Sequence, residues 1–526
     1  MAEPDPTEVA PWYLRNINQA LALDEASGNV YVRTGFEGNI IISGNVNIPG
    51  NVDAHISEIG TSGNLTVPWM PVSIDGNSTV SISGGNIDAN VSGNVGIVGN
   101  VNVTQGTDPW VVSGNVSISG TPTVTLGTDS QDAFGRLRVS NPTTLFDTQA
   151  RYYNHNQFAS NTVGSGTYTY DSNSSSFTMT VGTGGTDSVI AETYKVFPYQ
   201  PGKSLLIYST FCMNTPKTNV RQRVGYFGSQ NGIFFEANGT TLNMVIRSYS
   251  SGSIVEDRIP QSEWNGDTML GTGGPTNPSG LTLYPDRTQI FFCDIEWLGV
   301  GNVRVGFIVN GQYINCHTFQ HANMPGNTTT YMSTACLPLR YEITNTGAPI
   351  SGSTMRQICS SVISEGGYSL SGFPRSIGHS IASPVRLPND QSFKPLMSIR
   401  LKSTCPDSIV LPKFYTIAPV AQSTFKYRIY NTQATTSGGT WTSMGSDSPV
   451  EYNLAPTSVT GGTIVAEGFI ISSNQTAGAP VQVSFGFENQ LQRDSFTGTM
   501  YEYVLVACTT GTNQDVYASI EWQEVN

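Results

Sequence analysis

The sequence predicts an all-β protein in which a repetitive, fibrous region precedes two jelly-roll-like β-sandwiches. Three observations predict this fold. The dipeptide Gly-Asn followed by an aliphatic residue recurs nine times between Ser27 and Ser117. Short strand-like runs separated by turn signals fill the rest of the chain. Charged residues make up only 12% of the chain, about half the usual quarter, whereas aromatic residues make up 10%. This aromatic content indicates a folded chain rather than a disordered one.

Residues 1–28 are predicted to be an N-terminal attachment segment. Within it, residues 11–22 read PWYLRNINQALA, and Leu14, Ile17 and Leu21 fall at helical spacing. Proline at the start of this stretch suits the first turn of a helix. We therefore expect a short helix, which either caps the fibre or anchors the chain in another subunit.

Residues 29–128 form the repeat region, which we expect to build a fibrous shaft. From 40 to 56 its aliphatic residues and glycines fall on even numbers, with Ile41 as the exception, from 87 to 103 they fall mostly on odd numbers, and from 112 onward mostly on even numbers again. Alternate residues of a strand point to opposite faces, so one face is aliphatic or glycine and the other is polar. Each change between even and odd numbering requires an odd number of extra residues, which a turn or a β-bulge accommodates. The positions that define the six-residue unit are Gly44, Val46, Ile48, Gly50, Val52, Gly93, Val95, Ile97, Gly99, Val101, Gly114, Val116 and Ile118.

A single copy of this ribbon is not expected to be stable by itself. Its few aliphatic side chains gain less on burial than the backbone loses in conformational entropy, and its sheet edges would stay open. We therefore expect three copies to wind around one axis with the aliphatic faces inward. The alternative is a left-handed parallel β-helix made by one chain, since hexad repeats build that fold too. Uneven spacing between the repeats favours the intertwined shaft.

Two β-sandwiches are predicted after the shaft, over residues 129–390 and 391–526. Asn310-Gly311 between two strand-like runs predicts a tight hairpin. The runs expected to be strands are 204–208, 232–235, 242–246, 289–292, 303–309 and 312–314 in the first sandwich, and 423–430, 463–471 and 500–506 in the second.

The charge of the chain excludes several classes of partner. The formal net charge is −13, which argues against a nucleic-acid partner, since phosphate binding needs clustered Lys and Arg. The same sign disfavours binding to anionic lipid. No run of about 18 apolar residues occurs, so we expect no membrane insertion, and the acidic N-terminus does not read as a signal peptide.

The chain has seven cysteines. Their number is odd, none forms a C-x-x-C pair, and several lie in apolar runs. We expect buried free thiols, which fits assembly in a reducing cytosol.

Motifs for catalysis or metal binding are weak. His317 and His321 would point the same way on a strand, but two histidines without a third ligand make a poor metal site. Asp294 and Glu296 place two carboxylates on one strand face, yet carboxylate pairs of glycan-cleaving sites come from distant strands. The sequence therefore predicts a protein that is not an enzyme, with no catalytic residues, cofactor or metal.

Two tryptophans are the candidate surface-binding residues. Trp264 and Trp441 lie in polar, turn-like stretches, and exposed aromatic rings commonly bind carbohydrate or protein. The alternative for each is ordinary half-buried packing.

Several stretches together resemble virion structural proteins of tailed bacteriophages, of the tail-fibre, baseplate and head-fibre type. They are the residues 11–23, the Gly-Asn-Val repeats, the residues 132–147 and the residues 294–301. The resemblance implies a homotrimer, attachment to other virion proteins through the N-terminal segment, and C-terminal β domains that decorate the particle or touch the host. It also implies a location in the virion after assembly in the host bacterial cytoplasm. It supplies no catalytic residue.

The expected function is that of a non-enzymatic, trimeric, fibre-like component of a phage tail or baseplate that contacts a bacterial surface glycan or protein. One alternative is a purely architectural head fibre or baseplate connector without a receptor. Another is a depolymerase of capsule polysaccharide.

Overall fold

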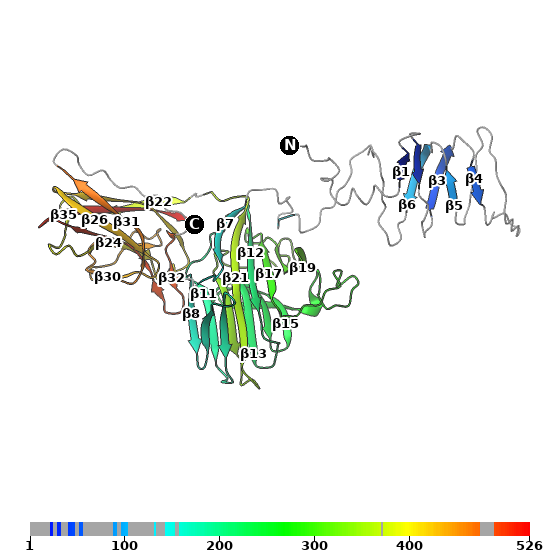
Figure 1. The fold of residues 1–526 in the computed structure, drawn as a ribbon, viewed down its shortest axis with the longest axis horizontal. Coiled ribbons are helices and arrows are strands. Elements are labelled where there is room, and N and C mark those ends of the chain that lie inside the picture. The colour runs from blue at the N-terminus through cyan, green and yellow to red at the C-terminus, as the bar shows by residue number, and fades with distance from the viewer. Residues whose placement is uncertain are drawn as a thin grey trace. The chain divides into compact units, whose positions relative to one another are not determined.

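The structure is a computed structural model that describes residues 21–24, 29–32, 40–47, 52–55, 88–91, 96–103, 131–132, 142–152, 157–369, 372–473 and 489–525. The chain divides into two compact units, 1–125 and 126–526. Regular structure in the described residues is strand, apart from a single turn of 3-10 helix, η3 (Gln261–Glu263) (Figure 1). The predicted all-β fold class is therefore confirmed.

In its described residues, the first unit has three short antiparallel strand pairs, drawn in blue in Figure 1. They are β1 (Leu21–Asp24) with β2 (Asn29–Val32), β3 (Ile40–Asn47) with β6 (Gly96–Val103), and β4 (Val52–His55) with β5 (Asp88–Val91). A parallel β-helix would pair its strands in parallel. The described strands therefore do not have the pairing of the one-chain alternative.

The register of β3 and β6 aligns the repeats with one another. Gly44 lies opposite Gly99, and Val46 lies opposite Ile97. Directly opposite positions share a face of the sheet, so the even-numbered repeat positions of β3 share a face with the odd-numbered positions of β6. This is the parity that the sequence predicts. Of the predicted shaft positions, Ile48, Gly50, Gly93, Val95, Gly114, Val116 and Ile118 lie outside the described residues.

The predicted N-terminal helix needs correction at its end. Leu21 and Ala22 belong to β1, which pairs with β2 across the predicted boundary at residue 28. Leucine and alanine favour helices, but pairing with a neighbouring strand overrides this weak preference. Residues 11–20 lie outside the described part of the chain. The winding of three chains stays a prediction.

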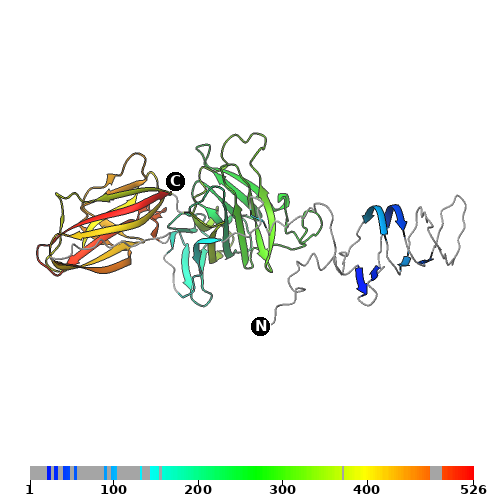
Figure 2. The ribbon, with the colours of Figure 1, turned by 90° about the horizontal axis from the view of Figure 1, so that it is seen from above.

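The first sandwich consists of an eight-stranded and a seven-stranded antiparallel sheet (Figures 1 and 2). The larger sheet contains, in spatial order, β19 (Gln312–Phe319), β18 (Val303–Val309), β17 (Gln289–Ile295), β12 (Ser204–Cys212), β21 (Ser353–Glu365), β10 (Ser176–Val181) and β9 (Thr167–Asp171), with β7 (Thr143–Thr148) also on β21. The smaller contains β16 (Val255–Pro260), β15 (Thr241–Ser248), β14 (Gly232–Asn238), β13 (Val220–Phe227), β20 (Leu339–Asn345), β11 (Ser188–Thr193) and β8 (Phe158–Val163).

Aromatic side chains from both sheets fill the space between them. Phe235 of the smaller sheet packs edge-on against Phe307 of the larger, with ring centroids 5.2 Å apart. Phe211, Phe291 and Tyr341 are buried in the same cluster. The predicted hairpin is present, because Asn310 and Gly311 both adopt positive φ between β18 and β19.

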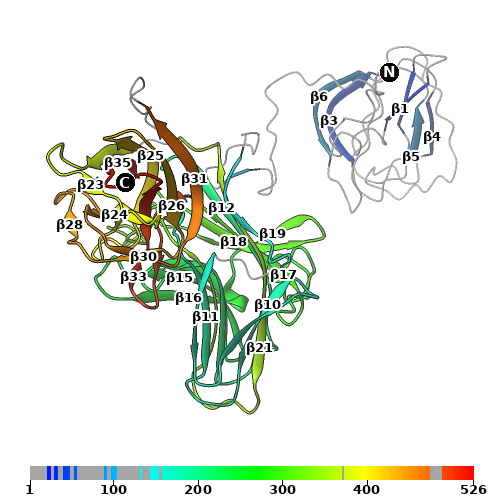
Figure 3. The same cartoon turned by 60° about the vertical axis from the view of Figure 1, so that its left-hand side comes forward.

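The second sandwich has a six-stranded and a four-stranded antiparallel sheet (Figure 3). The six-stranded sheet contains β28 (Thr442–Ser443), β29 (Val450–Asn453), β24 (Lys394–Leu401), β34 (Glu502–Thr509), β26 (Ser423–Asn431) and β31 (Thr463–Ser472). In the other, β35 (Asp515–Val525) pairs with β22 (Phe373–Gly378), β23 (Val385–Arg386) and β25 (Ile409–Pro419). Two small pairs are β27 (Thr435–Ser437) with β30 (Ser458–Thr460), and β32 (Arg493–Asp494) with β33 (Thr499–Met500).

The predicted boundary at residue 390 lies inside the second sandwich. Both β22 and β23 pair with β35, the last strand of the chain, so the second sandwich begins by Phe373. Local sequence patterns do not reveal which distant strand an element pairs with, and this is why the boundary was misplaced.

The cysteines are all free, as expected, but only partly buried. Cys293, Cys316 and Cys508 are buried, whereas the remaining four are half-buried. Across the described residues, no helix is both long and apolar enough for a membrane span.

Candidate functional site

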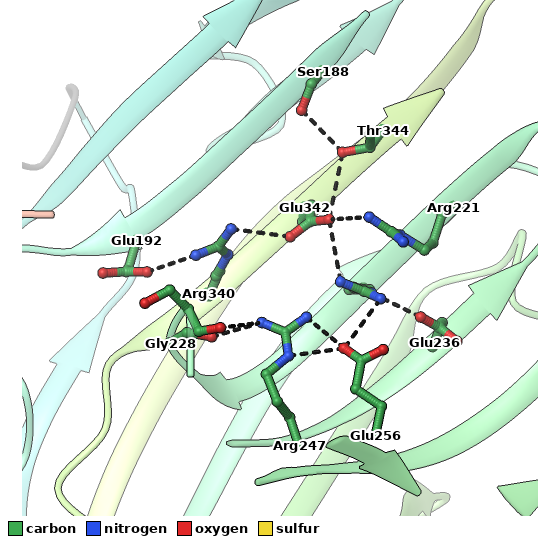
Figure 4. Close-up of polar contacts among 12 residues, drawn as sticks. Ser188, Glu192, Arg221, Gly228, Glu236, Arg247, Glu256, Arg340, Glu342 and Thr344 are labelled. Carbon is green, nitrogen blue, oxygen red and sulfur yellow. Dashed lines mark hydrogen bonds and ion pairs between the residues drawn. The ribbon is translucent and has the colours of Figure 1, made fainter. Parts of the chain in front are cut away.

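Charged side chains gather on the outer face of the seven-stranded sheet. Strand β20 shows how the sequence places them: its core residues Leu339, Tyr341 and Ile343 alternate with Arg340 and Glu342. Alternation in a strand sends these two charges to the opposite face. Together with charges from the neighbouring strands they form what we call the Arg/Glu ladder (Figure 4). Its members are Glu192, Arg221, Arg223, Glu236, Arg247, Glu256, Arg258, Arg340 and Glu342.

Glu342 is at the centre of the ladder. Its carboxylate oxygens lie 3.2 Å from Arg340, 3.4 Å from Arg221 and 3.6 Å from Arg223. Arg223 also donates from Nε to Glu236 Oε2 at 2.7 Å. Both Arg223 and Glu342 are buried, so each charge depends on its partners for the interactions that water would otherwise supply.

The ladder continues to the edge of the sheet. On β15 and β16, Arg247 lies 2.7 Å from Glu256, which also contacts Arg223 at 3.5 Å. Arg258 bridges Glu236 at 2.9 Å and contacts Glu256 as well. Consecutive ion pairs therefore connect β20, β13, β14, β15 and β16.

Aromatic rings support the guanidinium groups from the same face. Phe227 and Phe234 are fully buried beside Val245. The guanidinium carbons of Arg223 and Arg247 lie 5.1 Å and 5.2 Å from the ring centre of Phe234. These are cation–π distances, so the rings hold the arginines in place without competing for their hydrogen bonds.

The other end of the ladder reaches the second sandwich. Glu192 pairs with Arg340 at 3.0 Å and with Arg493 of β32 at 3.0 Å. Arg493 also donates to the Thr193 carbonyl at 2.9 Å and pairs with Asp407 at 3.0 Å. Arg493 is buried and joins one sandwich to the other, so the ladder is part of their contact.

Electrostatics lower the pKa of two carboxyl groups of the ladder. Burial by itself would raise the pKa of Glu342, but the charges of Arg340, Arg223 and Arg221 outweigh it and leave the pKa below its usual value. The pKa of Glu256 is lowered in the same way, because Arg223 and Arg247 outweigh its burial. A carboxylate with a lowered pKa is a poor proton donor near neutral pH. The arrangement suits rigid support better than acid catalysis.

The carboxylates and histidines considered from the sequence do not come together. Asp294 is buried and paired with Arg304 at 2.6 Å, while Glu296 lies beyond the end of β17. His317 accepts a hydrogen bond from the Asn265 backbone, and burial lowers its pKa to about 4. His321 stacks on Tyr331 with centroids 3.9 Å apart. In the described ranges, no cluster of three or more His, Cys, Asp or Glu could hold a metal ion.

The two candidate tryptophans have different environments. Trp264 is only 4% exposed and donates from Nε1 to the Ile259 carbonyl at 3.1 Å. It belongs to the core of the first sandwich, which corrects its assignment as a surface-binding residue. Trp441 is half-buried and stacks over Arg400, so it stays a candidate.

Sequence reasoning missed the Arg/Glu ladder. A signal was present, because Arg221-Gln-Arg223 and Arg340-Tyr-Glu342 place charges at every second position of strand-like runs. Such a pattern is normally the solvated face of a strand. Only the sheet order brings charges of opposite sign from β11, β20 and β13 side by side.

No protein-family profile and no curated protein matches the chain. Some solved structures are similar to part of it. A protein of unknown function from Shewanella oneidensis is 8% identical, covers 48% of this chain and 99% of its own, and has a TM-score of 0.29. A legume lectin-like domain from Entamoeba histolytica is 11% identical, covers 39% and 89%, and has a TM-score of 0.24. A beta-1,3-glucanase from Mycobacterium marinum is 9% identical, covers 42% and 98%, and has a TM-score of 0.27. At these values the likeness carries no conclusion about a site or an activity.

Proposed function

We propose that this protein is a non-enzymatic structural component of a phage virion, a trimeric fibre-like subunit of a tail or baseplate. Its N-terminal segment attaches to other virion proteins, residues 29–128 form a shaft, and the two sandwiches are carried at the end of the chain. The resemblance of the sequence to such proteins motivates the proposal.

The observation that carries the proposal is the register between β3 and β6. On one face it aligns Gly44 with Gly99 and Ile42 with Val101, whereas the other face is mainly polar, with Ser43 opposite Asn100. A ribbon with one aliphatic and one polar face needs further strands to cover the aliphatic one. Identical ribbons from two sister chains would provide that cover, because they carry the same pattern.

The Arg/Glu ladder does not have the properties of a glycan-cleaving pair. The carboxylates of the Arg/Glu ladder are each paired with arginine. A glycan-cleaving pair requires one carboxyl group that is protonated near neutral pH. The lowered pKa values of Glu256 and Glu342 do not meet that requirement.

The oligomeric state of the full-length chain tests the proposal. We expect light scattering to give the mass of a trimer. Val101→Asp introduces a charge on the aliphatic face of the ribbon, so we expect this variant to be monomeric. The matched control is Asn100→Asp, which adds the same carboxylate at the adjacent position on the polar face and should leave the trimer intact. A monomeric wild-type chain, or equal effects of the two substitutions, would overturn the shaft.

Location in the particle is tested by labelling. Antibody raised against the full-length chain should decorate the tail or baseplate of intact virions in electron micrographs. Decoration of the capsid instead would favour the architectural head fibre.

A further inference from the structure

Trp441 lies at the surface of the second sandwich, just before β28. Its ring covers Arg400 of β24, with the guanidinium carbon 3.9 Å from the ring centre. The ring is half-buried, while its neighbours Thr440 and Thr442 are exposed. An aromatic ring therefore borders solvent, with one cation held against it.

Arg400 is fixed beneath the ring by a row of opposite charges. The sheet register places Arg400 directly between Glu451 of β29 and Glu502 of β34. Its Nε donates to Glu451 Oε1 at 2.7 Å, and its Nη1 lies 3.9 Å from Glu502 Oε1. Glu502 is itself buried and accepts a hydrogen bond from the Thr436 backbone at 2.9 Å. The guanidinium plane, and with it the ring stacked on it, has a defined orientation.

The loop that carries Trp441 is held equally closely. Gly438 and Gly439 both adopt left-handed φ values, 73° and 71°. A Cβ on Gly439 would lie 2.2 Å from Asn453 Oδ1, so only glycine fits there. The buried Asn453 donates from Nδ2 to the Gly438 carbonyl at 2.8 Å. These contacts place the ring before any ligand arrives, which lowers the entropy cost of binding.

Charge indicates the class of ligand. The positive charge of Arg400 is already matched by Glu451, and the chain carries a formal net charge of −13. An anionic ligand is therefore disfavoured. A neutral sugar ring suits the position, because its C–H face packs on an aromatic ring while its hydroxyls bond to nearby polar groups.

We propose that Trp441 is a stacking platform for a pyranose ring of a neutral polysaccharide, with Glu451, on the same sheet face as Arg400, placed to hydrogen-bond its hydroxyls. The inference rests on the proposed function only in choosing a cell-surface polysaccharide as the ligand. It assigns host contact to the second sandwich.

The test uses the full-length protein and an array of neutral oligosaccharides built from glucose, galactose, mannose and rhamnose. We expect at least one class to bind. Trp441→Ala should weaken that binding at least about tenfold, which corresponds to the loss of a stacking contact. Trp441→Phe keeps an aromatic face and should restore much of the affinity. The matched control is Phe469→Ala, which removes an aromatic residue that is 64% exposed on β31 of the same sandwich and should leave binding unchanged.

The melting temperature of each variant shows whether it is folded. If the wild-type protein binds no member of the array, or if Trp441→Ala binds as well as the wild type, the platform is ruled out. Failure of the shaft is seen separately, in the mass of the wild-type chain. If the wild-type chain is a monomer and Trp441→Ala still loses sugar binding, the shaft is overturned but the sugar site is supported.

Discussion

Asp187 shows how a single carboxylate fixes two loops of the first sandwich. It accepts hydrogen bonds from the backbone amides of Ser165 at 3.2 Å, Gly182 at 3.1 Å and Gly184 at 3.2 Å, and from the Ser165 hydroxyl. The Ser165 hydroxyl contributes most to holding its pKa below the usual value, followed by the backbone amides. Donors from two loops converge on one side chain, so Asp187 determines how the loops meet.

Asp187→Asn should destabilise the first sandwich in a pH-dependent way. The folded state lowers the pKa of Asp187, so its contribution is present above the unfolded pKa of about 3.9 and is lost as the pH falls through the folded value. We expect the variant to melt a few degrees below the wild type at about pH 7, with the difference shrinking toward about pH 2. Thermal unfolding at several pH values measures this. A difference that is independent of pH would contradict the assignment.

Trp264 and Trp441 mark the limit of prediction for single residues. Both lie in polar, turn-like stretches of the sequence, and nothing local separates them. The two rings differ in their contacts. Trp264 bonds to Ile259 and packs in the core of the first sandwich, whereas Trp441 stacks on Arg400 of a distant strand. Both partners are set by tertiary structure.

At the scale of strands, the sequence identified elements whose hydrophobic runs end in clear turn residues. The runs beginning at Ser204, Gly232 and Gln289 are the starts of β12, β14 and β17. The Asn310-Gly311 turn is formed as expected because both residues tolerate positive φ. Short strands such as β22 and β23 were missed, since their stability comes from pairing with β35 rather than from their own composition.

The Arg/Glu ladder makes β20 sensitive to the loss of a single charge. Glu342→Gln leaves Arg340, Arg223 and Arg221 without their shared partner, and breaking a buried pair in this way costs about 3–5 kcal/mol. We expect a loss of that order in chemical denaturation at neutral pH. Because the pKa of Glu342 is lowered in the fold, its contribution should persist under mild acid and disappear as the pH falls through the folded value.

The control is Glu467→Gln on β31. Glu467 pairs with Arg428 at 2.7 Å but is 43% exposed, so water can replace the lost contact. Its removal should change stability very little. A similar loss of unfolding free energy in both variants would mean that burial does not determine how much an ion pair of the ladder contributes to stability.

At the scale of the whole molecule, the two sandwiches of the second unit share a contact through Arg493. Arg493 forms ion pairs with Glu192 and Asp407. Nearby, Gln490 donates a hydrogen bond to the Val196 carbonyl at 2.9 Å. Tyr194 and Tyr501 pack edge-on across the same contact. Because polar and aromatic contacts reinforce one another here, we expect the sandwiches to unfold together.

Arg493→Ala should uncouple the sandwiches. It leaves buried Glu192 with one partner fewer and costs about 3 kcal/mol or more. We expect calorimetry to show one unfolding transition for both sandwiches in the wild type and two in the variant. Arg386→Ala removes an ion pair with Asp515 within the second sandwich, where Arg386 is largely exposed, and should keep the transitions together. Two transitions already present in the wild type would contradict the coupling.

The sequence by itself determined the all-β class, the main repeat parity and the hairpin turn, because these follow from the alternation of side chains and from residues that favour particular backbone angles. Tertiary structure alone decided that the second sandwich begins by residue 373, that Trp264 is buried while Trp441 borders solvent, and that charges from six strands neutralise one another. Each of these features depends on which distant strands become neighbours. The ion pair between Arg375 and Glu524, for example, cannot be predicted from the residues next to either of them.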